Sequence, residues 1–275
     1  MPSHIKKLEA ILDQAKGERE RLTTLLGEEL HKKRLALFLG AGCSVAAGLP
    51  SWNDLIFNLL EKYEIRTRER DLLRIATRLE KQLGTGKLRE LVLEALSSIT
   101  QSGTALYEAF AHLDVNLYIT TNYDHLFEDV LVKRGIPAKK IYRDQDLPSI
   151  DLTQKVIVKL HGDLDSPSSL ILTSGDYARF SIEHKGIKDW LNSAVSQYTI
   201  LFIGTSFEDP RLKDADTYAL TLFGQFRRQP FILMRVPHRS KSQTEEDYET
   251  ALDDFVALCD DFRLRGFHTL LVEKY

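Results

Sequence analysis

The sequence predicts a doubly wound α/β fold built on a mainly parallel sheet. Three observations predict it: short apolar runs, helical segments between most of those runs, and polar turns that follow several of them directly. Continuous apolar runs of strand length are typical of strands buried on both faces, as in a parallel sheet. Because strands and helices alternate along the chain, we expect a Rossmann-like arrangement with helices on both faces.

A long amphipathic helix comes first. Apolar residues recur at helical spacing between residues 4 and 33, and Gly17 marks a point where the helix is expected to break. The apolar side of this helix is explained equally well by packing on its own domain and by an oligomer contact. We therefore expect an N-terminal helical segment, residues 1–34, within a single domain that spans residues 1–275.

Six apolar runs are predicted as strands, and a seventh is a candidate edge strand. The six runs are residues 35–39, 116–120, 156–160, 200–203, 231–236 and 269–273, and the edge candidate is 169–173. Helices are predicted at residues 124–134, 182–197, 211–226 and 245–265. Residues 54–112 hold several helical segments and no convincing strand, so we expect a helical insert subdomain there.

Composition excludes several classes of protein. The 37 Lys and Arg are balanced by 40 Asp and Glu, with no basic tail that would favour a nucleic acid. No secretion signal or membrane-length apolar run occurs, so we expect a cytoplasmic protein without membrane contact. Cys43 and Cys259 are the only cysteines, too few for a four-thiolate zinc site or a disulfide framework.

The first site-like segment, Gly40-Ala41-Gly42-Cys43-Ser44, follows the first predicted strand directly. Such a turn lets backbone N–H groups approach a pyrophosphate, with the positive end of a helix behind it. The glycine pattern is incomplete, because valine stands where a third glycine is usual. Phosphate binding and a simple tight turn therefore both remain as explanations.

The second segment, Thr120-Thr121-Asn122-Tyr123-Asp124, lies at the end of the strand predicted at 116–120. Polar residues at the carboxyl end of such a strand face the crevice in which open α/β sheets hold ligands. Asp124 is also explained as the cap of the next helix, whereas Asn122 has no such local role.

Two further segments also follow predicted strands. His161, next to Gly162, has the side chain whose ordinary pKa lies nearest neutrality, so it is a candidate general base as well as a structural histidine. The turn Gly204-Thr205-Ser206 offers hydroxyl groups to phosphate or ribose, or simply starts a turn. In a parallel sheet all four segments would line one crevice.

In this order, the motifs G-A-G-x-S, T-x-N-x-D, H-G and G-T-S resemble those of the sirtuin family. The forms T-T-N-Y-D, H-G-D and S-F-x-D-P are most similar to sirtuin-like NADase domains of bacterial anti-phage systems such as Thoeris. The resemblance covers roughly residues 35–275. It implies NAD as the substrate, bound through cofactor-contacting residues in three turns: Gly40, Ala41, Gly42, Ser44, Thr121, Asp124, Gly204, Thr205 and Ser206.

The resemblance also implies that Asn122 and His161 are the catalytic residues and that Asp124 helps to form the nicotinamide pocket. Sirtuin deacylases carry a zinc ribbon made from two pairs of closely spaced cysteines, and this sequence has no such pair. The expected activity is therefore NAD glycohydrolysis to nicotinamide and ADP-ribose, with no metal. The alternatives are a sirtuin-type deacylase or ADP-ribosyltransferase, and a non-catalytic sensor of NAD or ADP-ribose.

Unrestrained NAD hydrolysis would be toxic, so the resemblance implies regulation. We expect a homo-oligomer, or an activating or regulatory protein partner from the same defence system. The sequence ends at Tyr275, shortly after the last predicted strand, and fits either a piece of a longer protein or one component of a two-gene system. The trigger, the oligomeric state, the preference between NAD and NADP, and the choice between hydrolysis and cyclisation stay open at this point.

Overall fold

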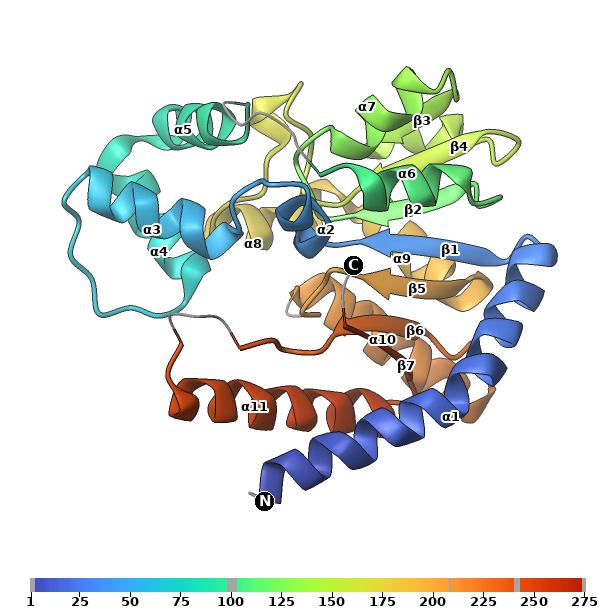
Figure 1. Cartoon of the computed structure of the whole chain (residues 1–275). Coiled ribbons are helices and arrows are strands. Elements are labelled where there is room, and N and C mark those ends of the chain that lie inside the picture. Colours follow the sequence, from blue (N-terminus) through green and yellow to red (C-terminus); the bar gives the residue numbers. More distant parts are fainter. Residues whose placement is uncertain (1–2, 98–102, 208, 240–242, 274–275) are drawn as a thin grey trace.

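The computed structural model describes residues 3–97, 103–207, 209–239 and 243–273. They form a seven-stranded sheet in the order β3-β4-β2-β1-β5-β6-β7, and all neighbouring strands are parallel (Figure 1). The strands are β1 Leu35–Leu39, β2 Leu117–Thr120, β3 Ala138–Ile141, β4 Lys155–Lys159, β5 Thr199–Ile203, β6 Phe231–Arg235 and β7 His268–Val272. The predicted doubly wound parallel fold is confirmed.

The helices lie between these strands. They are α1 Ser3–His31, α2 Ala41–Ala46, α3 Trp52–Lys62, α4 Leu72–Leu83, α5 Thr85–Ser97, α6 Ala105–His112, α7 Leu126–Lys133, α8 Ser174–Glu183, α9 Lys185–Gln197, α10 Pro210–Phe223 and α11 Glu245–Leu264. Among the described helices, none combines the length and the apolar character needed to cross a bilayer.

The predicted break at Gly17 is wrong, because α1 continues through this residue. A glycine inside a helix costs only about 1 kcal/mol relative to alanine. Helix α1 packs along α11 and β7, and its Leu22 is fully buried, so tertiary contacts offset that cost. In Figure 1 the long α1 helix borders α11 along one edge of the molecule.

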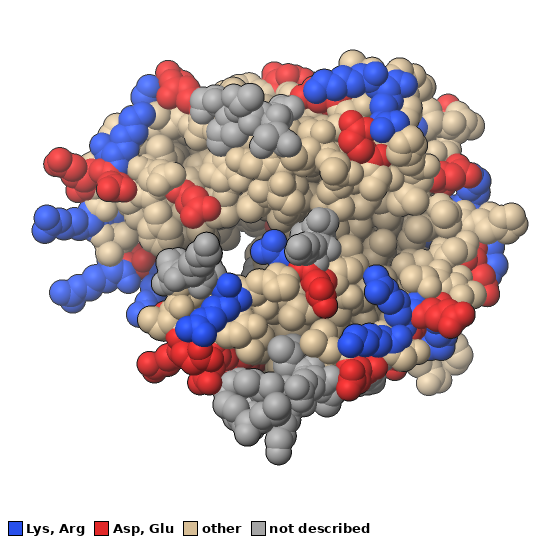
Figure 2. Space-filling model, in the orientation of Figure 1, with Lys and Arg blue, Asp and Glu red and all other residues tan. Residues whose placement is uncertain are grey.

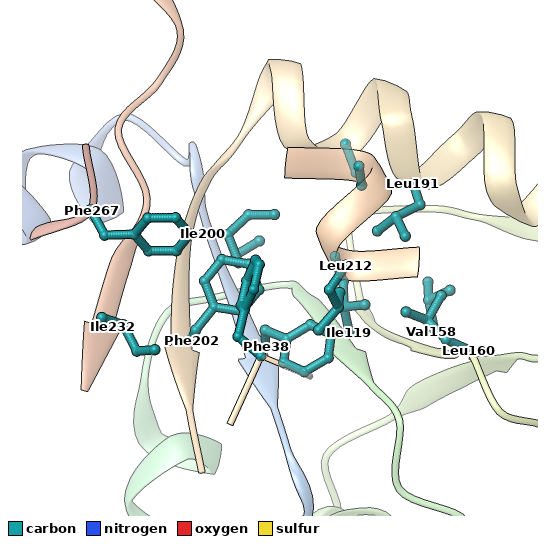
Figure 3. Close-up of a cluster of buried hydrophobic side chains, with 14 of the residues drawn as sticks. Phe38, Ile119, Val158, Leu160, Leu191, Ile200, Phe202, Leu212, Ile232 and Phe267 are labelled. Atoms are coloured by element: carbon teal, nitrogen blue, oxygen red, sulfur yellow. The ribbon is translucent and has the colours of Figure 1, made fainter. Parts of the chain in front are cut away.

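Both faces of the sheet are covered by helices. On one face, Phe38 of β1 and Phe202 of β5 pack against Leu191 of α9 and Leu212 of α10, and the two rings lie 5.2 Å apart (Figure 3). On the other face, Tyr118 of β2 packs against α6 and α7. This two-sided burial explains the unbroken apolar runs in the sequence.

Helices α3, α4 and α5 enclose a third apolar cluster of their own, which includes Ile56, Leu79 and Val92. Helix α6 packs on the sheet instead, so only part of the predicted insert at 54–112 forms this separate cluster. In Figure 1 the three helices lie beyond the arrowheads of the strands, at the carboxyl edge of the sheet.

The edge strand predicted at 169–173 is wrong. Leu170 and Leu172 pack into the α3–α5 cluster while Ile171 packs into the sheet cluster, which produces a strand-like alternation. The backbone hydrogen bonds go elsewhere: the N–H of Leu172 donates to the Asp176 carboxylate rather than to a neighbouring strand. The edge strand β3 was not predicted, because its sequence AKKI is half exposed and charged.

The position of β1 sets the location of the ligand crevice. The chain passes from β1 to β2 on one side, and later returns to place β5 on the other side of β1. Reversal of the strand order opens a crevice at the carboxyl ends of the two strands. The turns after β1 and β5 are the segments Gly40–Ser44 and Gly204–Ser206.

Candidate active site

The turns after β1 and β5 are joined backbone to backbone. The N–H of Gly40 donates to the carbonyl of Ile203 at 2.8 Å, and the N–H of Gly42 donates to that of Gly204 at 2.7 Å. A Cβ on Gly40 would lie 2.5 Å from the Gly204 oxygen, so the close approach requires glycine. The Gly42 amide, predicted to contact diphosphate, thus already has an acceptor.

Cys43 lies within this junction and is buried. Burial, reinforced by the negative charge of Asp124, raises the pKa of its thiol to about 12. A thiol of such high pKa is protonated at neutral pH and is a poor nucleophile. Cys43 is therefore a small buried residue that fills space between the two turns.

Asn122 is the centre of a buried hydrogen-bond network. Its Nδ2 donates to the carbonyl of Gly40 at 3.1 Å and to Oγ of Ser44 at 2.9 Å. Ser44 Oγ in turn donates to the Asp124 carboxylate at 2.7 Å and lies 2.9 Å from the hydroxyl of Tyr107. A backbone carbonyl can only accept, so the Gly40 contact fixes which end of the Asn122 amide is the NH2 group.

This orientation leaves Oδ1 of Asn122 buried and without a hydrogen-bond partner among the described residues. The whole residue is 8% exposed. A buried acceptor with no partner costs about 1–3 kcal/mol, so such a group calls for an explanation, such as a catalytic role or an ordered water. Oδ1 is therefore an acceptor that can take a hydrogen bond from a hydroxyl or a water.

Asn122 lines a cavity of about 60 Å³ between the first two turns and the start of α3. Trp52 and Tyr123 supply aromatic walls, with ring centroids 6.2 Å apart. The other lining residues are Ala41, Ser44, Leu49, Pro50, Ser51, Leu55, Leu96, Thr121 and Asp124. The structure thus gathers five of the predicted site residues around one small, mainly apolar cavity: Ala41, Ser44, Thr121, Asn122 and Asp124.

The third predicted turn, Gly204–Ser206, does not line this cavity but is hydrogen-bonded to the first turn through Gly42 and Gly204. Gly204 has a φ of +66°, and Thr205 Oγ1 accepts from the N–H of Phe207, so this hydroxyl shapes its own loop. Ser206 is exposed. In Figure 2 the viewed face carries charges of both signs and is hollowed between the insert and the sheet.

His161 makes a separate set of contacts. Its Nε2 lies 2.6 Å from Oδ2 of Asp209 and 3.2 Å from the hydroxyl of Tyr177. The ring of Tyr123 lies 5.8 Å from the imidazole, centroid to centroid, and so connects His161 to the cavity that Asn122 lines. The two predicted catalytic residues, Asn122 and His161, therefore lie on either side of Tyr123 rather than against each other.

A buried lysine supports the turn that carries Asn122. Lys159 of β4 donates to the carbonyls of Tyr123 and Asp124 at 3.1 and 2.8 Å, and its side chain has no solvent exposure. Its charge is balanced by Glu128 at 2.9 Å and by Asp163 at 2.8 Å. Burial alone would raise the pKa of Asp163, but His125 and Lys159 hold it well below its usual range.

Two histidines beside carboxylates are expected to titrate in opposite directions. The hydrogen bond between the partly buried His125 and Asp163 raises the pKa of His125. Burial and the nearby Arg211 lower the pKa of His161 to about 4. An NMR titration of labelled histidines should show His125 protonating at clearly higher pH than His161. Equal midpoints, or the reverse order, would contradict these environments.

The same shift has a consequence for stability. His161 is neutral in the folded protein down to about pH 4 but gains a proton near pH 6.5 when unfolded. Its contribution to stability is therefore present above pH 6.5 and is lost as the pH falls towards 4.

Several site residues were not predicted from the sequence. Tyr107 comes from α6, in a segment without a recognisable motif, and Tyr177 from the start of α8. Asp209 stands immediately before a proline at a helix start, which is a helix-cap signal, and its Oδ1 does accept the N–H of Arg211 at 2.9 Å. The contact of Asp209 with His161 could not be predicted, because only the fold brings the two residues together.

The sequence matches the family profile described as SIR2-like domain over residues 116–254. The chain belongs to the SIR2-like family. This SIR2-like chain is 26% identical over 252 residues to "NAD(+) hydrolase ThsA" of Bacillus cereus (strain MSX-D12), which covers 90% of the chain and 53% of the relative. It is 28% identical over 254 residues to the protein of the same name from Cytobacillus dafuensis, covering 90% of the chain and 51% of the relative.

The SIR2-like chain therefore spans about half the length of these curated relatives. Among solved structures, one described as "Structural Basis for the Mechanism and Regulation of Sir2 Enzymes" aligns with 86% of the chain and 96% of its own. The TM-score of that alignment is 0.44 and the sequence identity is 15%.

Proposed function

We propose that this protein is an NAD glycohydrolase that cleaves NAD to nicotinamide and ADP-ribose. Its similarity to two proteins named NAD(+) hydrolase, over 90% of its length, supports this activity. The observation that carries the proposal is the buried amide of Asn122, whose NH2 group is fully used and whose Oδ1 has no partner among the described residues.

In the proposed complex, the cavity that Asn122 lines receives the nicotinamide end of NAD. The aromatic rings of Trp52 and Tyr123 would pack against the positively charged nicotinamide ring, and Oδ1 of Asn122 would accept a hydrogen bond from the ribose or from the attacking water. Asp124 would act through Ser44, which holds the Asn122 amide in place.

The remaining turns would hold the rest of the substrate. The turn Gly40–Ser44, with Ala41 and Gly42, would lie along the diphosphate. The loop Gly204–Ser206 would approach phosphate or the adenosine ribose through Thr205 and Ser206. Thr121 lines the cavity beside Asn122 and would contact the substrate there.

The chemistry breaks the bond between C1′ of the ribose and the nicotinamide nitrogen. The bonding electron pair goes to the positively charged ring, which leaves as neutral nicotinamide, and a water oxygen bonds to C1′. The chain needs to position the ribose, stabilise the oxocarbenium-like transition state and remove one proton. His161 is the group proposed to accept that proton, a role worth about 10²–10⁴ in rate, and the reaction as written calls for no metal.

The setting of this activity is also a proposal. We propose that the protein acts in bacterial anti-phage defence, as its resemblance to the sirtuin-like NADase domains of Thoeris-type systems implies, and that it does so in the cytoplasm. We propose that hydrolysis is restrained until the chain assembles into a homo-oligomer or meets a regulatory protein partner. A strictly monomeric sample with full activity would contradict control by assembly.

Replacement of Asn122 by alanine tests the proposal. The Asn122→Ala variant should lose at least about 100-fold in the rate of nicotinamide release, since a positioned polar group in such a site contributes about that much or more. The measurement is chromatography of NAD incubated with purified protein, with NAD binding measured in parallel by calorimetry. Asn58→Ala is the matched control, because Asn58 is exposed on α3.

The outcomes separate the competing functions. Nicotinamide and ADP-ribose from the wild type and from Asn58→Ala, but not from Asn122→Ala, would support hydrolysis. Turnover that begins only when an acylated peptide or an acceptor protein is added would favour a deacylase or transferase. NAD binding without turnover in any assembly state would favour a sensor, and absence of both binding and turnover would overturn NAD as the ligand.

A further inference from the structure

Asp209 makes more contacts than a helix cap needs. Its Oδ1 accepts from the backbone N–H of Arg211 at 2.9 Å and from Nε of Arg211 at 3.2 Å. Its Oδ2 accepts from Nη2 of Arg211 at 3.0 Å and from the hydroxyl of Tyr177 at 2.9 Å, and lies 2.6 Å from Nε2 of His161. Oδ1 therefore caps the helix and binds Arg211, while Oδ2 binds Arg211, Tyr177 and His161.

Arg211 keeps this carboxylate in place. Its Nη1 donates to the carbonyl of Leu160, the residue before His161, at 2.8 Å. Its guanidinium lies over the ring of Tyr177, 4.6 Å from the centroid. Arg211 and Asp209 are both largely buried, so the carboxylate, the guanidinium and the imidazole form one buried hydrogen-bonded unit.

The protonation state of this unit follows from its environment. Burial alone would raise the pKa of Asp209, but hydrogen bonds from His161 and Arg211 hold it well below its usual range, so the group is a carboxylate. His161 is neutral at pH 7 because burial lowers its pKa to about 4. A neutral imidazole beside a carboxylate donates its one N–H to it, and here the nitrogen in contact is Nε2.

We propose that Asp209 is the positioning residue for His161: its carboxylate holds the imidazole proton on Nε2 and leaves Nδ1 as the nitrogen that accepts a proton during the reaction. This inference rests on the proposed function and adds to it a residue with no assigned role. As water adds to C1′, its proton passes to Nδ1, and the imidazolium that forms is stabilised through Nε2–H by the Asp209 carboxylate. Release of the proton to solvent regenerates the neutral imidazole.

An asparagine at position 209 separates this role from helix capping. Asparagine is as good a cap as aspartate, so Asp209→Asn should keep α10 intact. We expect the amide oxygen to stay at the Oδ1 position, where the backbone N–H and Nε of Arg211 require an acceptor. The NH2 group would then take the place of Oδ2 and donate to Nε2 of His161, which forces the imidazole proton onto Nδ1. Nη2 of Arg211 would lose its acceptor, and the Tyr177 hydroxyl would have to accept instead of donate.

The experiment compares Asp209→Asn with the wild type in two ways. Nitrogen chemical shifts of labelled His161 at pH 7 should report the Nε2–H tautomer in the wild type and the Nδ1–H tautomer in Asp209→Asn. The kcat for nicotinamide release should fall at least about 100-fold, the size expected when a general base is lost, while KM stays within about threefold. Asp209→Ser, which keeps a capping group but cannot reach His161, should give mixed tautomers and an intermediate kcat.

Asp71→Asn is the matched control for a change at a helix cap. Asp71 accepts the N–H groups of Leu73 and Arg74 at the start of α4, and its side chain is half exposed. Its substitution should leave both the tautomer of His161 and kcat unchanged. If Asp209→Asn does not fold, the Asp209→Ser comparison decides the question by the same two readouts.

Three results would overturn the inference. The wild-type His161 could carry its proton on Nδ1, Asp209→Asn could leave the tautomer and kcat unchanged, or kcat could rise, which would make the contact a restraint. The tautomer measurement needs no substrate. A wild type that carries the Nε2–H tautomer but never cleaves NAD would therefore reject the proposed function while keeping the role of Asp209 as the group that orients His161.

Discussion

Replacement of Gly204 by alanine should destabilise the protein by about 2–5 kcal/mol. The backbone of Gly204 is left-handed, with a φ of +66°, which costs an L-residue about 1–2 kcal/mol. The added Cβ would also lie 2.6 Å from the backbone nitrogen of Cys43 and 2.9 Å from its sulfur. Backbone cannot rotate away as a side chain can, so the two turns must separate, with an overpacking cost of about 1–3 kcal/mol or more.

Gly135→Ala is the control that isolates the steric part. Gly135 has nearly the same φ, +67°, but a Cβ there would meet nothing within 4 Å. Its substitution should therefore cost only the backbone contribution, about 1–2 kcal/mol. Urea unfolding of both variants gives the two free energies, and equal losses would show that the contact between the turns after β1 and β5 is not tight.

The Lys159→Met variant should lose about 3–5 kcal/mol, because it removes the counter-charge of Glu128 and one of the counter-charges of Asp163, which keeps His125 and Lys140. Lys159 stands between Glu128 and Asp163, at 2.9 and 2.8 Å, and its side chain has no solvent exposure. It also satisfies the carbonyls of Tyr123 and Asp124, which follow Asn122 directly. We therefore expect the turn that carries Asn122 to loosen as the stability falls.

Lys155→Met is a matched control on the same strand. Lys155 is also buried, but it donates to the carbonyls of Leu113 and Val115 and to the hydroxyl of Tyr118, with no carboxylate in these contacts. Its loss should cost only about 1–3 kcal/mol, the usual range for unsatisfied neutral groups. Adding Glu128→Gln to Lys159→Met should recover part of the stability. A similar loss in Lys159→Met and Lys155→Met would show that an unpaired carboxylate is not the cause.

Much of the fold could be predicted from the sequence, because the apolar patterns that mark strands and helices are local or periodic. The run LALFL is apolar at every position because β1 is covered on both faces. Five other strands could be predicted for the same reason. Strand β3 and the segment 169–173 were misjudged, since a short edge strand carries little apolar signal and an irregular segment between two cores can alternate like a strand.

The candidate site, too, could be predicted only in part from the sequence. By itself the sequence placed Asn122, His161 and the two glycine turns after strands, and in a parallel sheet strand ends necessarily meet at one edge. Only the tertiary structure decided that Oδ1 of Asn122 lacks a partner among the described residues, that Gly42 donates to Gly204, and that Asp209 reaches His161. These contacts join residues 48 to 162 positions apart, and sequence spacing carries no information about such distances until the sheet has brought its strands together.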